Sequence, residues 1–149
     1  MTMLYLKFKF FLFIISKMTN IIKIPFQEKY SLEHRKKETI KVKQRYPNRI
    51  PVIISKSINS NIADINNEKF LIPESLTVCQ LIQVIRERIK INEYEAINIF
   101  IITLDNTEIL PASGSSILSI YNEYVESRKD HPKYDGYLYV VYSGENVFG

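Results

Sequence analysis

The sequence predicts an α+β fold of the β-grasp type, a four-stranded mixed sheet packed on a helix, with two additional helices before it. Three observations lead to this prediction. Two short apolar, β-branched segments, 49–55 and 69–72, flank a polar loop. A helical pattern with a capping signal follows at 77–89. A continuous apolar segment near the chain end, 137–142, is typical of a central strand.

The composition limits the number of domains and the class of protein. With 149 residues, 46% of them hydrophobic, the chain suffices for one core and is short for two. We therefore expect residues 18–149 to form a single domain. The only cysteine, Cys79, cannot form an internal disulfide, and no Cys/His cluster has metal-ligand spacing. The sequence thus favours a reducing, cytoplasmic setting and predicts no metal or cofactor.

Residues 1–17 form an atypical apolar extension. Its apolar run 10–15 is too short to cross a bilayer, and Lys7 and Lys9 interrupt the segment. The start is not basic and no small-x-small cleavage site follows the run, which disfavours a signal peptide. Ordinary composition resumes at Met18. The extension is therefore either part of the protein or upstream sequence read together with it, and it is left out of the fold prediction.

A helical subdomain is expected at about 21–46. Residues 21–30 are at best a weak helix. Ser31 is a good N-cap for a basic helix over 32–45, and Pro47 ends that helix. The apolar positions of this helix are Leu32, Thr39, Ile40 and Val42.

The sheet begins after this subdomain. Segment 49–55 is predicted to be a strand that tolerates Pro51 at an edge or a bulge. The polar loop 59–67 leads to a second strand at 69–72, which Pro73 stops. The two strands are expected to pair like a hairpin.

The best-defined helix follows this pair. Thr77 and Gln80 form a capping box, and apolar residues continue at helical spacing to Ile89. The remaining predicted elements are a strand at 97–103, a short helix at 115–124 and a central strand at 137–142. Two mostly polar stretches, 103–109 and 125–133, are expected to be surface loops.

Basic residues concentrate between residues 23 and 49, where Lys and Arg outnumber Glu. Such a patch either meets acidic partners or anionic lipid, or is the solvated face of a helix. Tyr30 and Tyr46 are the only aromatic residues among these charges that base stacking would use. We therefore expect no nucleic-acid partner.

The chain ends on a polar turn followed by Phe148 and Gly149. Glycine has no Cβ, so a terminal glycine can enter a narrow enzyme channel and present its carboxylate there. A conjugation tail, here residues 143–149, must meet this demand. A frayed terminus without function is the alternative.

Four ordered stretches carry a family resemblance. They are Tyr46-Pro-Asn-Arg-Ile-Pro-Val-Ile53, Lys69-Phe-Leu-Ile-Pro73 with Leu76-Thr-Val, Ile85-Arg-Glu-Arg-Ile89, and Asp135 to Gly149. Together they resemble the autophagy-related ubiquitin-like modifiers, the GABARAP and autophagy-related protein 8 family. The resemblance covers residues 21–149.

The resemblance implies a substrate of enzymes rather than an enzyme. In this family an activating enzyme adenylates the terminal glycine, conjugating enzymes carry it as thioesters, and it is joined to phosphatidylethanolamine on autophagosomal membranes. Gly149 would take that role here, without a priming cut. A deconjugating cysteine protease would release the protein from lipid. The expected location is the cytoplasm, and the autophagosome membrane after lipidation.

Family partners carry an aromatic-x-x-aliphatic motif, and an exposed edge strand at 69–72 would bind it by β-augmentation. By resemblance, the aromatic pocket consists of Glu38, Val42, Pro51, Lys69, Leu71 and Tyr137. The aliphatic pocket consists of Phe70, Ile72, Pro73, Leu76, Leu81 and Val84. Arg49 and Lys69 suit the acidic residues that flank such motifs, although exposed ion pairs contribute only about 0–1 kcal/mol each.

Three positions depart from the family pattern. Tyr137 stands where phenylalanine is usual, so its hydroxyl narrows the aromatic pocket or points to water. Leu81 replaces a usual aromatic, which should widen the aliphatic pocket, but it also lies on the inward stripe of its helix and is equally a core candidate. Val84 lies off that stripe. Cys79 replaces a usual glycine; with no base suggested nearby, we expect a small buried hydrophobe rather than a nucleophile.

Two other functions stay open at this point. One is an adaptor that keeps the peptide groove but is never conjugated to lipid. The other is a basic protein that binds anionic membrane directly through Arg35, Lys36 and Lys37, with binding that fades as salt rises.

Overall fold

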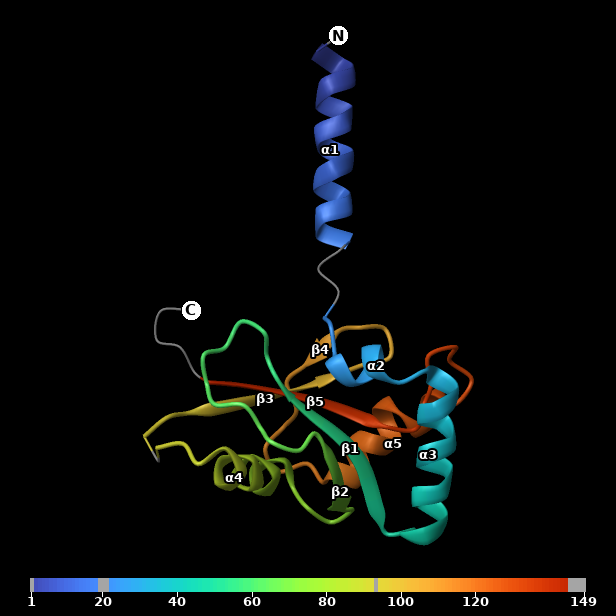
Figure 1. Cartoon of the computed structure of the whole chain (residues 1–149), viewed down its shortest axis with the longest axis vertical. Coiled ribbons are helices and arrows are strands. Elements are labelled where there is room, and N and C mark those ends of the chain that lie inside the picture. Colours follow the sequence, from blue (N-terminus) through green and yellow to red (C-terminus); the bar gives the residue numbers. More distant parts are fainter. Residues whose placement is uncertain (1, 19–21, 93, 145–149) are drawn as a thin grey trace.

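The computed structural model describes residues 2–18, 22–92 and 94–144, and it confirms the predicted α+β class. A mixed sheet crosses the folded part of the chain, and helices cover both of its faces (Figure 1). The strands are β1 (Arg49–Lys56), β2 (Lys69–Pro73), β3 (Ile97–Ile102), β4 (Glu108–Ile109) and β5 (Leu138–Gly144).

The strand order in the sheet is β2-β1-β5-β3-β4. Strands β1 and β5 are parallel, and the other neighbours are antiparallel. The apolar last strand is therefore central and β2 is an edge strand, as predicted. The prediction of four strands missed β4, which lies in the expected loop 103–109. A strand of two residues is too short to show a hydrophobic period.

Side chains along β1 and β5 alternate between two cores, because the side-chain period of a strand is two residues. The helices are α2 (Pro25–Lys29), α3 (Leu32–Arg45), α4 (Val78–Ile89) and α5 (Ile117–Tyr124), followed by a 3-10 turn at Glu126–Arg128. Val52, Leu138 and Tyr142 pack with α4 and α5 in the larger core. On the opposite face, Ile53 and Tyr139 belong to a smaller cluster with Phe26 of α2.

Both predicted helix starts are confirmed by their hydrogen bonds. The Ser31 hydroxyl accepts from the His34 N–H at 3.2 Å, which caps α3. At the start of α4, the Thr77 hydroxyl accepts from the Gln80 N–H and the Gln80 side chain accepts from the Thr77 N–H. These side chains satisfy N–H groups that have no partner within the helix.

A buried polar network ties α3 to the start of β5. The guanidinium Nη1 of Arg35 lies 2.5 Å from Asp135 Oδ2 and 3.1 Å from the Tyr139 hydroxyl. The Thr39 hydroxyl donates to the Asp135 carbonyl at 2.6 Å. A Cβ on the next residue, Gly136, would lie 2.5 Å from that hydroxyl, and φ of Gly136 is +87°. Glycine thus permits both the backbone conformation and the close approach of α3.

Two expectations about burial and strand position were wrong, those for Cys79 and Pro51. Ile40, one of the apolar positions of α3, is 57% exposed, and the buried residues of this helix are Arg35 and Thr39. Cys79 is exposed in the first turn of α4 rather than buried. Pro51 lies within β1, an interior strand whose pairing with β2 is continuous and shows no bulge.

An additional helix, α1 (Thr2–Met18), precedes the fold and stands apart from the sheet in Figure 1. No secondary structure was predicted for it. Among the side chains of α1 that are described, those of residues 2–11, the exposed large apolar ones are Met3, Leu4, Tyr5, Leu6, Phe8, Phe10 and Phe11. Among the described helices, α1 included, none combines the length and the apolar character needed to cross a bilayer.

Candidate functional site

The edge strand β2 is the centre of the candidate site. Among the residues that the structure describes, it pairs only with β1, in the register Ile53↔Lys69 to Arg49↔Pro73. The Ile54 N–H donates to the Glu68 carbonyl at 2.8 Å. Bonded and non-bonded pairs alternate in an antiparallel ladder, so Lys69 and Leu71 are in non-bonded pairs. Their N–H and C=O groups therefore point away from β1, toward the open edge.

The same alternation explains why Pro51 is tolerated. Pro51 faces Leu71 in a non-bonded pair, so its missing N–H removes no bond to β2. The N–H would instead point toward β5, whose pairing with β1 begins one residue later, at Val52↔Leu138.

The predicted pocket residues of β2 lie on opposite faces of the sheet. Phe70 and Ile72 are opposite Val52 and Ile50 and pack with the larger core. Lys69 and Leu71 point to the other face, the side of α3. The strand thus presents two different surfaces to anything that pairs with its edge.

On the α3 side, the Lys69 side chain closes over an aromatic cluster. Its Nζ lies 2.5 Å from Glu38 Oε1, 5.5 Å from the Phe26 ring centre and 5.4 Å from the Tyr30 ring centre. An ammonium over aromatic faces and beside a carboxylate is held by both charge and ring quadrupoles. A partner that inserts an aromatic side chain here must compete with this ammonium.

Tyr137 lies beneath that cluster. It is 3% exposed, and its ring meets the Phe26 ring edge-on at 5.2 Å. Burial raises the pKa of the Tyr137 hydroxyl, and the negative charge of Glu38 raises it further. The hydroxyl therefore stays protonated near the Glu38 carboxylate. Of the other residues predicted here, Pro51 is buried and Val42 is partly buried.

On the α4 side, the predicted residues divide into core and surface. Ile72 and Leu81 are buried in the larger core, at 4% and 0% exposure. Phe70, Leu76 and Val84 are partly buried, and Pro73 is exposed. Leu81 is therefore a core residue. The accessible part of this surface consists of Phe70, Pro73, Leu76 and Val84.

Two aromatic residues at this site were not predicted from the sequence. Phe26 and Tyr30 come from α2 and its C-cap, with their rings 5.0 Å apart, and both contact the Lys69 ammonium. A five-residue helix gives little periodic signal. Its one usable sign was Pro25 in the first turn, next to an apolar residue.

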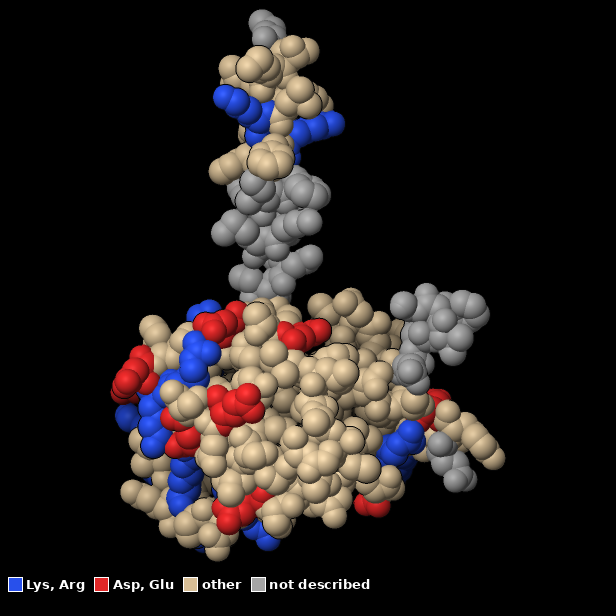
Figure 2. All heavy atoms as spheres, turned by 180° about the vertical axis from the view of Figure 1, so that it is seen from behind, with Lys and Arg blue, Asp and Glu red and all other residues tan. Residues whose placement is uncertain are grey.

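The basic character of α3 is mostly a solvated surface. Figure 2 shows Lys and Arg side chains interleaved with Asp and Glu over this part of the molecule. Lys37 pairs with Glu33 at 3.4 Å, and both side chains are exposed. The hypothesis of a membrane site made by Arg35, Lys36 and Lys37 was wrong for Arg35, which is 9% exposed and paired with Asp135.

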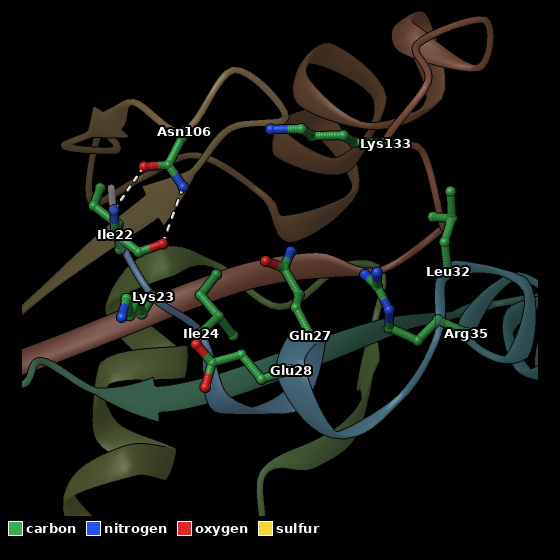
Figure 3. Close-up of a pocket in the computed structure, with 9 residues that line it drawn as sticks. All are labelled: Ile22, Lys23, Ile24, Gln27, Glu28, Leu32, Arg35, Asn106 and Lys133. Carbon is green, nitrogen blue, oxygen red and sulfur yellow. Dashed lines mark hydrogen bonds between the residues drawn. The ribbon is translucent and has the colours of Figure 1, made fainter. Parts of the chain in front are cut away.

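A separate cavity of about 620 Å³ lies between α2, the start of α3 and the loops at Asn106 and Lys133. The side chains of Gln27, Arg35 and Lys133 are directed into it (Figure 3). At its rim, Asn106 accepts from the Ile22 N–H at 2.7 Å and donates to the Ile22 carbonyl at 3.0 Å. This cavity was not predicted from the sequence, because its residues come from four separate segments.

The exit of the predicted conjugation tail is anchored, although Gly149 itself lies outside the described residues. The Gly144 N–H donates to the Ser60 hydroxyl at 3.1 Å, and the Tyr142 hydroxyl donates to the Ala63 carbonyl at 2.7 Å. Burial raises the pKa of Tyr142 to about 12. The loop before β2 thus fixes the point where the last strand ends.

Comparison with known proteins identifies the family. A family model described as "Autophagy protein Atg8 ubiquitin like" matches residues 34–149. The chain belongs to the Atg8 family. Autophagy-related protein 8 of Schizosaccharomyces pombe is 44% identical over 124 residues, which cover 83% of this chain and 93% of that protein. Autophagy-related protein 8 of Mycosarcoma maydis is also 44% identical, with 83% and 95% covered.

A solved structure agrees with the Atg8 assignment. The crystal structure of Trypanosoma brucei ATG8 has a TM-score of 0.68 and 35% sequence identity, and covers 85% of this chain and 99% of that one. The ubiquitin-like fold and the family predicted from the sequence are therefore confirmed. The chain is a ubiquitin-like protein of autophagy.

Proposed function

We propose that this Atg8-family chain is a modifier that is conjugated through Gly149 to phosphatidylethanolamine on autophagosomal membranes. Once there, it recruits cargo receptors and adaptors by pairing their peptides with β2. The protein is a substrate of activating and conjugating enzymes, and of a deconjugating cysteine protease, and is not itself an enzyme. It is cytoplasmic until it is lipidated.

The observation that carries the docking part of this proposal is the open edge of β2. The backbone groups of Lys69 and Leu71 point away from β1, and an extended peptide needs such groups to add a strand. Backbone pairing supplies affinity without regard to sequence, so selection depends on what lies beside the strand.

The two surfaces beside β2 match the two ends of an aromatic-x-x-aliphatic motif. On one side lie the aromatic rings under Lys69 and the ion pair between Lys69 and Glu38, which a partner group can displace. On the other, Phe70 and Leu76 are partly buried apolar side chains that pack on the core and keep accessible surface. An aromatic side chain would enter the first surface, and an aliphatic side chain would cover the second.

The conjugation part is tested by a Gly149→Ala variant expressed in cells in which autophagy is induced. A methyl group at the reacting residue is expected to block the narrow channels of the enzymes, so the lipid-shifted form should disappear. Asn146→Ala is the matched control, because it alters the tail and keeps the glycine. Equal lipidation of wild type and Gly149→Ala, measured by intact mass of the membrane fraction, would contradict the proposal.

The same spectra decide between a modifier and an unconjugated adaptor. A membrane species heavier by one phosphatidylethanolamine supports the modifier. Only unmodified protein in both fractions, together with peptide binding at β2, would establish the adaptor instead. The mass of the unmodified chain also shows whether residues 1–17 are present.

A further inference from the structure

One side chain already occupies part of the open edge of β2. Asn67 precedes the strand by two residues, and its amide makes two bonds to the Lys69 backbone. Oδ1 accepts from the Lys69 N–H at 3.3 Å, and Nδ2 donates to the Lys69 carbonyl at 3.1 Å. The side-chain amide thus presents to Lys69 a donor and an acceptor, as the backbone of a neighbouring strand would.

The two groups that Asn67 binds are those that face the open edge. Lys69 is in a non-bonded pair with Ile53, so its N–H and carbonyl point outward. A peptide that adds a strand across from Lys69 needs both groups. It must first displace the Asn67 amide.

We propose that Asn67 is a specificity-determining residue that competes with incoming peptides for the Lys69 backbone. This inference rests on the proposed docking function of β2. A peptide replaces both bonds when it offers a carbonyl to the Lys69 N–H and an N–H to the Lys69 carbonyl, whereas a proline at the position that would donate to this carbonyl replaces only the first. Such a proline peptide can leave the bond from Asn67 Nδ2 to the Lys69 carbonyl in place. Asn67 therefore weakens the binding of the proline peptide less than that of a peptide that must displace both bonds.

At Leu71, the other residue whose backbone groups face the open edge, a different side chain makes the contact. Arg49 Nη1 donates to the Leu71 carbonyl at 3.2 Å, and this contact is exposed. A carboxylate on the partner can draw the guanidinium away from the carbonyl, because a charged acceptor is the stronger one. No charge helps to remove the neutral amide of Asn67. Its displacement depends on backbone pairing alone, which is why it selects on backbone chemistry.

The first test needs no ligand. In hydrogen exchange followed by NMR, the Lys69 amide of the free protein is expected to exchange slowly for an edge residue and faster in Asn67→Ala. Asn66→Ala is the matched control: Asn66 is the preceding exposed asparagine and makes no side-chain hydrogen bond to the described residues. If the Lys69 amide exchanges at the same rate in wild type and in Asn67→Ala, the proposed contact of the Asn67 amide is overturned.

The second test measures binding of a synthetic peptide with an aromatic-x-x-aliphatic core by calorimetry. Loss of an exposed pair of competing bonds should tighten binding by about two- to fivefold in Asn67→Ala, with no change in Asn66→Ala. A matched peptide with proline at the position that would donate to the Lys69 carbonyl should gain less than the parent peptide, because Asn67 can keep one of its two bonds when that peptide is bound. Unchanged affinity for both peptides in Asn67→Ala would overturn the specificity role.

The two proposals fail in different ways. If the peptide binds wild type and Asn67→Ala equally, docking at β2 stands and the role of Asn67 is lost. If the peptide binds neither protein while the Lys69 amide still exchanges faster in Asn67→Ala, the docking function is contradicted and the inference about partners falls with it.

Discussion

The two edges of the sheet are built differently. The β2 edge is a strand of five residues, Lys69–Pro73, with a row of outward backbone groups. The β4 edge has only two residues, Glu108–Ile109, and the turn that leads into it is bonded to the N-terminal segment. An asparagine amide binds backbone N–H and carbonyl groups at both ends: Asn106 binds Ile22, a distant residue, and Asn67 binds Lys69, two residues away.

This difference concerns how much of the fold depends on the contacts at each edge. At the β4 end, Asn106 joins segments 84 residues apart, so breaking its bonds releases part of the fold. At the β2 end, the Asn67 bonds are local and exposed, so breaking them frees only backbone groups of the edge. An open edge invites uncontrolled pairing unless it is short, charged or covered. Here the long edge is partly covered by the exposed side-chain contacts of Asn67 and Arg49.

The largest effect is expected from removing an outward donor of β2. Leu71→Pro eliminates the N–H that faces the open edge and leaves the bonds of Phe70 and Ile72 to β1 in place. Peptide affinity should fall by about tenfold or more, since a backbone bond and side-chain contact are both lost. Leu71→Ala removes the side chain alone and should lose less, as measured by calorimetry.

The result counts only if the variant folds, which a urea unfolding curve establishes. If folded Leu71→Pro binds the peptide as well as Leu71→Ala does, the peptide does not pair with β2. The β2 edge would then not be the docking side of the sheet.

At the β4 end, Asn106→Gly should cost stability rather than binding. Asn106 has φ of +62°, which glycine adopts without strain, so this variant removes the side-chain bonds to Ile22 and little else. The loss of two partly buried hydrogen bonds should lower the free energy of unfolding by about 1–2 kcal/mol. Asn106→Ala should lose more, because alanine is strained at this backbone angle.

Chemical unfolding measures both variants, and exchange of the Ile22 amide locates the effect. The affinity of the peptide for β2 should stay unchanged in Asn106→Gly. A loss of affinity comparable to that of Leu71→Pro would mean that the two edges are coupled through the sheet.

Much of this difference between the two edges could not be predicted from the sequence. The continuous apolar pattern of 137–142 predicted a central strand, and the Thr77 capping box predicted the start of α4, because both signals are local. Neither asparagine had such a signal, since its role depends on register and on which strand ends at an edge. Arg35 was read as part of a charged surface because its partner, Asp135, is 100 residues away in sequence.

The same limit applies to the candidate site. The family resemblance named Lys69 and Glu38 together, and the structure places their charged atoms in contact. It gave no sign that Phe26 and Tyr30 complete this surface, because α2 is too short to show a period. Leu81 was equally a pocket or a core residue by pattern, and only its complete burial distinguishes the two.

Strong acid should weaken the contacts that Asp105 makes near the β4 end. Asp105, next to Asn106, accepts hydrogen bonds from Arg128 at 2.9 Å and interacts with His131 at 3.2 Å, and these contacts hold its pKa below the ordinary value of 3.8. A carboxyl with a lowered folded pKa stabilises the fold above its unfolded pKa, and this contribution is lost as pH falls through the folded pKa. An NMR titration of Arg128→Ala should move the Asp105 pKa back toward 3.8. An unchanged Asp105 pKa in this variant would show that the contact does not persist in solution.

The smallest effect is expected at Arg49, on the β2 edge. Its guanidinium is exposed and bonds the Leu71 carbonyl, so Arg49→Ala frees an acceptor for the peptide and at the same time removes an attraction for acidic flanks. Exposed ion pairs contribute about 0–1 kcal/mol, so for an acidic peptide the net loss should be at most about fivefold and should shrink as salt rises. For a peptide with neutral flanks the freed carbonyl remains and the lost charge is irrelevant, so affinity should be unchanged or slightly higher. Calorimetry with both peptides at low and high salt separates the two contributions. Equal losses for both peptides would mean that Arg49 supports the strand itself, and that the β2 edge is held as firmly as the β4 end.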